Sequence, residues 1–65
     1  MSTYKLAKDI QIGEEVVGPE GVIYTVAAIH DEADEIEFGL LLWGDEGATA
    51  EVVLKAGAFE EVEVA

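Results

Sequence analysis

The alternation of apolar and polar residues along this chain predicts a series of short β-strands separated by turns. The segments with strand character are 14–17, 22–30, 36–43, 49–54 and 60–64. Within 36–43, one face carries Ile36, Phe38, Leu40 and Leu42, and the other carries Glu37, Gly39, Leu41 and Trp43. The segment 60–64 alternates most regularly, because each of its two valines follows a glutamate. The pattern as a whole is typical of an all-β domain.

Turn sequences separate these strands. In Gly18-Pro19-Glu20-Gly21, proline suits the second position of a type I turn and glycine the fourth. The acidic segment Asp31–Glu35 and the segment Gly44–Gly47 predict two further exposed turns. Short turns between consecutive strands indicate antiparallel pairing.

The segment 49–57 fits two structures. As a strand, it directs three apolar side chains inward, Ala50, Val52 and Leu54. As a short helix or 3-10 turn, it has Thr49 as its N-cap and Gly57 as the residue past its end. The two adjacent valines favour the strand, since β-branched residues fit a pleated sheet. The sequence leaves both structures open.

The chain has 65 residues and is expected to fold as a single domain, residues 1–65, with residues 1–6 frayed. A domain of this size buries only about 60% of the surface that its unfolded chain exposes, so its core is thin. Cysteine is absent, which excludes disulfides and thiolate ligands for a metal. His30 is the only histidine, and it cannot form a zinc site without further ligands. Five short strands in so few residues predict a small β-barrel or two packed sheets.

No segment has the character of a membrane span or a secretory signal. The longest apolar runs are Val26–Ile29 and Leu40–Trp43, far below the ~20 residues that a transmembrane helix needs. The N-terminal residues are not followed by an apolar block. We therefore expect a soluble, intracellular protein without membrane contact.

The order of turns and strands resembles that of SH3-like small β-barrels. The residues that carry the resemblance are the run Ala7–Val17, the turn Gly18–Gly21, the strand residues Tyr24–Val26 and the closing Phe59–Val64. The chain is most similar to small acidic SH3-like proteins of bacteriophages and high-GC bacteria. The resemblance implies a five-stranded barrel and carries over no catalytic residue. It also implies a phage accessory or virion protein, located in the host cytoplasm or the virion.

Charge narrows the range of functions. The formal net charge is −12, and the segment between Lys8 and Lys55 contains twelve carboxylates and no basic residue. Arginine is absent, and phosphate neutralisation needs several cations, so we expect no direct binding of DNA or RNA. SH3-like proteins that bind RNA are basic, unlike this chain. The charge instead indicates a basic protein partner, or mutual repulsion that keeps the protein soluble.

Candidate catalytic and metal-binding residues are few. His30 beside Asp31 is the only pairing with general-base character, and Ser2 is the only serine. His30 is more simply a half-exposed residue at a strand end, and a small barrel has little room for a ligand pocket of ~300 Å³. We expect no enzyme, no catalytic residue and no cofactor. The four carboxylates Asp31, Glu32, Asp34 and Glu35 lack the spacing and the glycine of a calcium loop, so we also expect no metal site.

Apolar residues occupy both faces of two predicted strands. Ile23 and Ile29 alternate with Tyr24 and Val26, and Leu41 and Trp43 alternate with Leu40 and Leu42. Strands that are apolar on both faces are usually covered on both faces. One cover is a loop of the chain itself, such as Tyr4–Ile10. The other is a protein partner or a second copy, bound through the candidate interaction residues Leu41, Trp43, Ile23 and Tyr24.

Two functional hypotheses follow. In the first, the domain is a non-enzymatic interaction or structural module that self-associates or docks on a larger assembly through its apolar strand face. In the second, it is an acidic inhibitor that imitates a nucleic acid and occupies the basic groove of a nucleic-acid-binding or defence protein. The carboxylates available for mimicry are Glu14, Glu15, Glu20, Asp31, Glu32, Asp34, Glu35 and Glu37.

Overall fold

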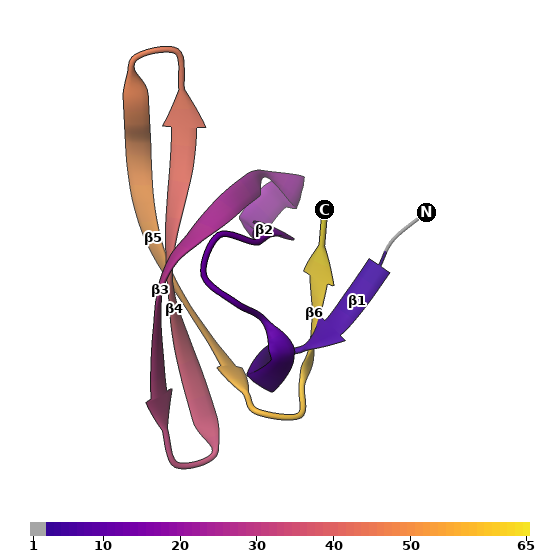
Figure 1. Ribbon diagram of the computed structural model, residues 1–65. Helices are drawn as coiled ribbons and strands as arrows, with labels where there is room; N and C mark the ends of the chain where they lie inside the picture. Colours follow the sequence, from indigo (N-terminus) through magenta and orange to yellow (C-terminus); the bar gives the residue numbers. More distant parts are fainter. Residues whose placement is uncertain (1–2) are drawn as a thin grey trace.

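The computed structural model describes residues 3–65, which form one antiparallel sheet of six strands (Figure 1). The strands are β1 (Thr3–Leu6), β2 (Glu15–Val17), β3 (Ile23–Glu32), β4 (Glu35–Gly44), β5 (Gly47–Gly57) and β6 (Glu61–Val64). Their order across the sheet is β1-β6-β2-β3-β4-β5. Two 3-10 turns, η1 (Ala7–Asp9) and η2 (Pro19–Gly21), lie before and after β2. The prediction of an all-β domain is confirmed.

The sheet differs from the expected five-stranded closed barrel. Within residues 3–65 the two edge strands, β1 and β5, do not pair with each other, so the sheet stays open. The additional strand is β1, which lies in the segment expected to fray and pairs with β6 from Thr3↔Val64 to Leu6↔Glu61. Residues 1 and 2, the rest of that expectation, lie outside the described residues.

The segment 49–57 is a strand, and the helical alternative is wrong. It belongs to β5, which pairs with β4 from Gly44↔Gly47 to Glu35↔Gly57. This register places Val52 opposite Leu40 and Leu54 opposite Phe38. The neighbouring strand thus decides between two structures that local propensity left open.

The core lies on one face of the sheet, here called the inner face. Its buried residues come from every part of the chain: Ala7, Ile10, Val16, Tyr24, Val26, Ile36, Phe38, Leu40, Ala56 and Val62. The turn η1 covers one end of this face, where the Ala7 N–H donates to Glu60 O (2.8 Å) and the Lys8 N–H donates to Ala58 O (3.0 Å). These bonds hold the segment after β1 against the connection between β5 and β6.

Tyr24 belongs to this core and is 8% exposed. Its ring lies against Gly18, where an added Cβ would come within 2.5 Å of a ring carbon. Any larger residue at position 18 would displace the ring. The turn that follows also differs from expectation: Glu20 has a φ of +62°, which excludes the type I turn, whose third residue has a φ near about −90°.

A β-bulge in β3 changes which face its residues occupy. The register with β4 shifts between Val26 and Ala28, so that Ile29 lies opposite Phe38 on the inner face. The expectation that Ile29 shares the second face with Ile23 is therefore wrong. The bulge inserts one residue, and the simple period of two no longer holds across it.

Replacing Phe38 tests the position of the core. Phe38→Ala should lower the free energy of unfolding by about 3–5 kcal/mol, because the ring is 1% exposed and its loss leaves a cavity. Phe59→Ala is the matched control, since Phe59 is 76% exposed, and it should change that free energy by less than about 0.5 kcal/mol. Urea denaturation followed by circular dichroism measures both. Equal losses in the two variants would contradict the assignment.

Candidate outer-face interaction surface

The opposite face of β3, β4 and β5, here called the outer face, is not covered by any segment among residues 3–65. The pairing register places on it Thr25, Ala28, His30, Glu37, Gly39, Leu41, Glu51, Val53 and Lys55. Val53 is 59% exposed, and Trp43, which follows Leu41 on this face, is 56% exposed. The segment Tyr4–Ile10 does not supply the cover considered above, since its buried residues Ala7 and Ile10 join the inner core.

A shallow open depression of about 400 Å³ lies on this face. It is lined by the outer-face residues Ala28, His30, Glu32, Glu37, Gly39, Glu51 and Val53, together with Ile29, which packs against the inner core. Its floor is low because Gly39 lacks a side chain, and an added Cβ there would lie 3.2 Å from the Ala28 Cβ. The sequence predicted little room for a pocket inside the domain. The depression lies on the surface instead, with Ala28, Gly39 and Val53 as its apolar residues and Glu32, Glu37 and Glu51 as its acidic ones.

The ends of β4 and β5 form a two-stranded arm that extends beyond β3 (Figure 1). The last pair between β3 and β4 at this end is Thr25↔Leu41, whereas β4 and β5 stay paired as far as Gly44↔Gly47. The Thr49 hydroxyl donates to Leu42 O (3.1 Å) within the arm. Trp43 therefore projects from a hairpin that no third strand among residues 3–65 supports.

The structure separates the four predicted interaction residues. Leu41 and Trp43 lie on the same face of β4, with Leu41 partly buried. Ile23 is 48% exposed and lies where β3 pairs with β2. Tyr24 is in the core and leaves only 8% of its surface exposed. Sequence analysis missed Val53, although its alternation with Val52 and Leu54 would have placed it on the outer face.

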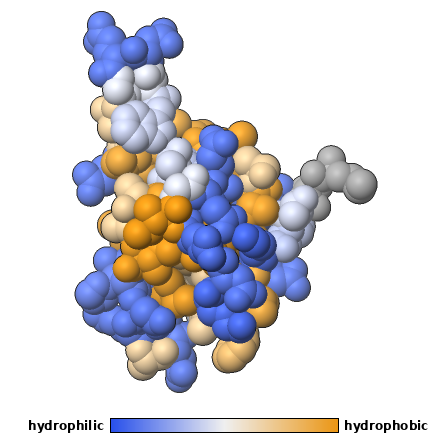
Figure 2. All heavy atoms as spheres, in the orientation of Figure 1, coloured by the Kyte–Doolittle hydropathy of each residue, from blue (hydrophilic) through white to orange (hydrophobic). Residues whose placement is uncertain are grey.

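The acidic residues gather in separate places. Figure 2 shows hydrophilic side chains at both tips of the long strands, with hydrophobic side chains between them. One tip is the β3–β4 turn, with Asp31, Glu32, Asp34 and Glu35, and the other is the β4–β5 turn, with Asp45 and Glu46. The ten residues of β4 separate the two tips by about 33 Å. The remaining predicted acids, Glu14, Glu15 and Glu20, lie in or beside β2, and Glu37 lies on the outer face.

His30 does not pair with the expected carboxylate. Its Nε2 lies 3.1 Å from Glu32 Oε1, and both side chains are 69% exposed. Asp31 precedes Glu32 on the strand, so its side chain points to the opposite face. The His30–Asp31 dyad considered from the sequence is not formed, and the contact of His30 with Glu32 is largely exposed to solvent.

Within the part of the chain that the structure describes, no three acidic or histidine side chains come together in a way that could hold a metal ion. The described helical segments are 3-10 turns, and none of them is long and apolar enough to cross a membrane. Ser2, the only serine, lies outside the described residues.

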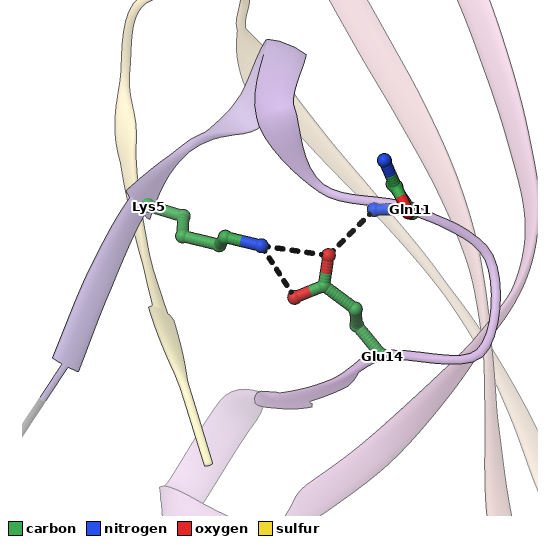
Figure 3. Close-up of polar contacts among 3 residues, drawn as sticks. All are labelled: Lys5, Gln11 and Glu14. Atoms are coloured by element: carbon green, nitrogen blue, oxygen red, sulfur yellow. Dashed lines mark hydrogen bonds and ion pairs between the residues drawn. The ribbon is translucent and has the colours of Figure 1, made fainter.

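The Glu14 carboxylate accepts three hydrogen bonds (Figure 3). The Lys5 Nζ donates to both of its carboxylate oxygens (2.9 and 3.0 Å), and the Gln11 N–H donates to Oε1 (3.0 Å). Gly13, with a φ of +97°, lets the loop turn back so that its N–H donates to Val26 O (2.8 Å). The contact links β1 to the loop before β2 and occupies one of the predicted mimic carboxylates.

No protein-family model, curated protein or solved structure matches this chain. Its function is therefore inferred from the outer face, the arm and the distribution of charge.

The ion pair makes a prediction about titration. The side-chain hydrogen bond from Lys5 is the main cause that lowers the pKa of Glu14, followed by the Gln11 N–H, while desolvation opposes both. Because the folded pKa lies below the unfolded value, this contact stabilises the fold above the ordinary carboxyl pKa. The stabilisation is lost as the pH falls through the lowered pKa.

An NMR titration of the glutamate carboxyl carbons should measure a Glu14 pKa below that of an unstructured glutamate. Lys5→Met should raise it toward the ordinary value. Lys8→Met is the control and should leave it unchanged, because Lys8 pairs with Asp9 instead. A Glu14 pKa insensitive to Lys5→Met would show that the contact does not form in solution.

Proposed function

We propose that this protein is a non-enzymatic interaction module that docks on a protein partner through its outer face, with Trp43 and Leu41 as the principal contacts. The observation that carries the proposal is the exposure of Trp43 and Val53 on a sheet face that no segment among residues 3–65 covers, beside the arm formed by the ends of β4 and β5. Tryptophan is enriched among residues that dominate binding energy at interfaces. An isolated two-stranded hairpin is marginal in water, so a surface that packs against the arm would stabilise it.

The resemblance to SH3-like phage proteins provides the setting for this proposal. The partner is then a larger phage assembly or a second copy of the chain, and the protein acts as an accessory or virion component in the host cytoplasm or the virion. The high negative charge keeps free molecules apart until they dock. No nucleic acid, membrane or cofactor is part of the proposal.

Mimicry of a nucleic acid has less support. A mimic needs its acids along one stripe with phosphate-like separations. Glu14 already pairs with Lys5, and the other candidate acids divide between the surroundings of β2, the β3–β4 turn and, for Glu37, the outer face. The exposed apolar side chains of the outer face, Trp43 and Val53, have no role in that hypothesis.

The two functions are distinguished by substitutions that remove one surface at a time. The tagged protein captures its partners from a lysate of the cells that make it, and bound proteins are quantified by mass spectrometry. Trp43→Ala combined with Leu41→Ala should reduce capture of the specific partner by about tenfold or more, as expected for residues at a binding hot spot. Phe59→Ala is the control, because it removes an exposed aromatic side chain outside the outer face.

The triple variant Glu32→Lys, Asp34→Lys and Glu35→Lys supplies the opposite test. It should leave capture nearly unchanged under the docking proposal and abolish it under mimicry. Loss of capture in this variant, with no loss in the Trp43 variant, would overturn the proposed docking face.

A further inference from the structure

The outer edge of β5 has free backbone groups at alternate residues. The Ala58 N–H donates to Asp34 O (2.9 Å). This bond identifies which opposed residue pairs of β4 and β5 are hydrogen-bonded and which are not. Antiparallel pairs alternate between bonded and non-bonded, so Glu51, Val53 and Lys55 direct their N–H and C=O groups away from β4. Within residues 3–65, no strand lies on that side of β5.

This edge is long, and no strand among residues 3–65 pairs with it. β5 has eleven residues, no proline, and a register irregularity only near the arm, between Leu42 and Trp43 of its neighbour. Exposed edges are ordinarily shortened, bulged or covered, because they are templates for pairing with another strand. The other edge strand, β1, has four residues. The β5 edge is therefore the surface where an added strand gains the most backbone hydrogen bonds.

The side chains along this edge complement themselves. Glu51 and Lys55 lie two residues on either side of Val53, all three on the outer face. An antiparallel copy centred on Val53 would place Glu51 opposite the partner's Lys55 and Lys55 opposite the partner's Glu51. A two-fold interface requires this self-complementarity. Opposite charges at directly opposed strand positions stabilise a pair, whereas like charges destabilise it.

Residues next to Glu51, Val53 and Lys55 on both faces of the sheet also favour this register. Lys55 lies opposite Glu37 of its own chain, with Nζ and Oε2 3.9 Å apart, so each lysine would lie between two glutamates of the combined sheet. On the inner face, Val52 would meet the partner's Leu54. Both side chains are only half-buried in one copy, and they are paired with the fully buried Leu40 and Phe38. The pairing would extend the core as well as the ladder.

From these observations we infer that two copies of this protein associate by antiparallel pairing of their β5 edges, with the two-fold axis at Val53. This inference rests on the proposed function and specifies a second copy as an occupant of the β5 side of that surface. Lys55 favours a second copy as the occupant, because its ammonium group is the least closely paired of the three lysines. Lys5 and Lys8 have acidic partners at 2.9 and 3.4 Å, whereas Lys55 lies 3.9 Å from the Glu37 carboxylate. In such a dimer, the arm of each copy lies beside the Gly57 end of the partner's β5.

Charge reversal tests the register. Sedimentation equilibrium should show a dimer for the unmodified protein. Glu51→Lys alone and Lys55→Glu alone should each weaken dimerisation by about tenfold or more, because two opposite-charge pairs become two like-charge pairs. An equimolar mixture of the two variants should recover a heterodimer, and the double variant should recover a homodimer. Both side chains are exposed, so the fold should persist, as circular dichroism would verify.

The control for net charge is Glu15→Lys, an equal change on β2 that should not alter dimerisation. A dissociation constant weaker than about 1 mM for the unmodified protein would overturn the inference, as would single reversals without effect or a mixture that does not recover the dimer. If dimerisation fails these tests but capture still depends on Trp43, only the dimer is wrong. If dimerisation passes and no capture depends on Trp43, the docking proposal is wrong and the dimer stands.

A backbone substitution tests the edge independently of charge. Val53→Pro removes an N–H that points away from β4, at a position where an edge strand tolerates proline. This variant should stay folded and become monomeric. If it folds and remains a dimer, the β5 edge is not the contact.

Discussion

The packing of β4 between β3 and β5 is the constraint on which the rest of the structure depends. Phe38 and Leu40, at 1% and 0% exposure, lie at the centre of the inner face, and both neighbouring strands direct their apolar residues toward them. The buried apolar residues among residues 3–65 form one such layer, and no segment of that range covers the outer face of the sheet. The exposure of Trp43 and Val53 is thus a consequence of how the core is made.

An open sheet also has two edge strands, β1 and β5, which differ in length and in the contacts of their side chains. β1 is short and is held by the ion pair between Lys5 and Glu14. β5 is long, with charged side chains of opposite sign at alternate outer-face positions. The net charge of −12 opposes the unselective pairing that a long edge invites. Overall repulsion between two copies is compatible with attraction at one place on the edge. Salt screens distant charges, so the choice of register depends on the charges that lie directly opposite each other.

Sequence patterns predicted most of the strands and only part of the surface. Sequence patterns located β2 to β6 and assigned Leu41 and Trp43 to the outer face, because a period of two is a local property. They missed the bulge after Val26, which depends on pairing with β4, and they could not exclude a helix at 49–57, where the competing strand gains its stability from a distant neighbour. Tyr24 was misplaced for a similar reason: its ring is buried because Gly18 leaves room for it.

Register explains why the acidic composition does not prevent specific association. The free N–H and C=O groups at the β5 edge belong to alternate residues, Glu51, Val53 and Lys55 among them. A partner strand can therefore form hydrogen bonds only in registers that set these residues opposite partner residues whose N–H and C=O groups also point outward. Adjacent registers set Glu51 or Lys55 against Val53, leaving charges beside an apolar side chain without a partner. Registers one step further oppose Glu51 to Glu51 or Lys55 to Lys55. The arrangement centred on Val53 is the one in which each of these charges meets its opposite, so a strongly acidic chain can still distinguish one pairing from its neighbours.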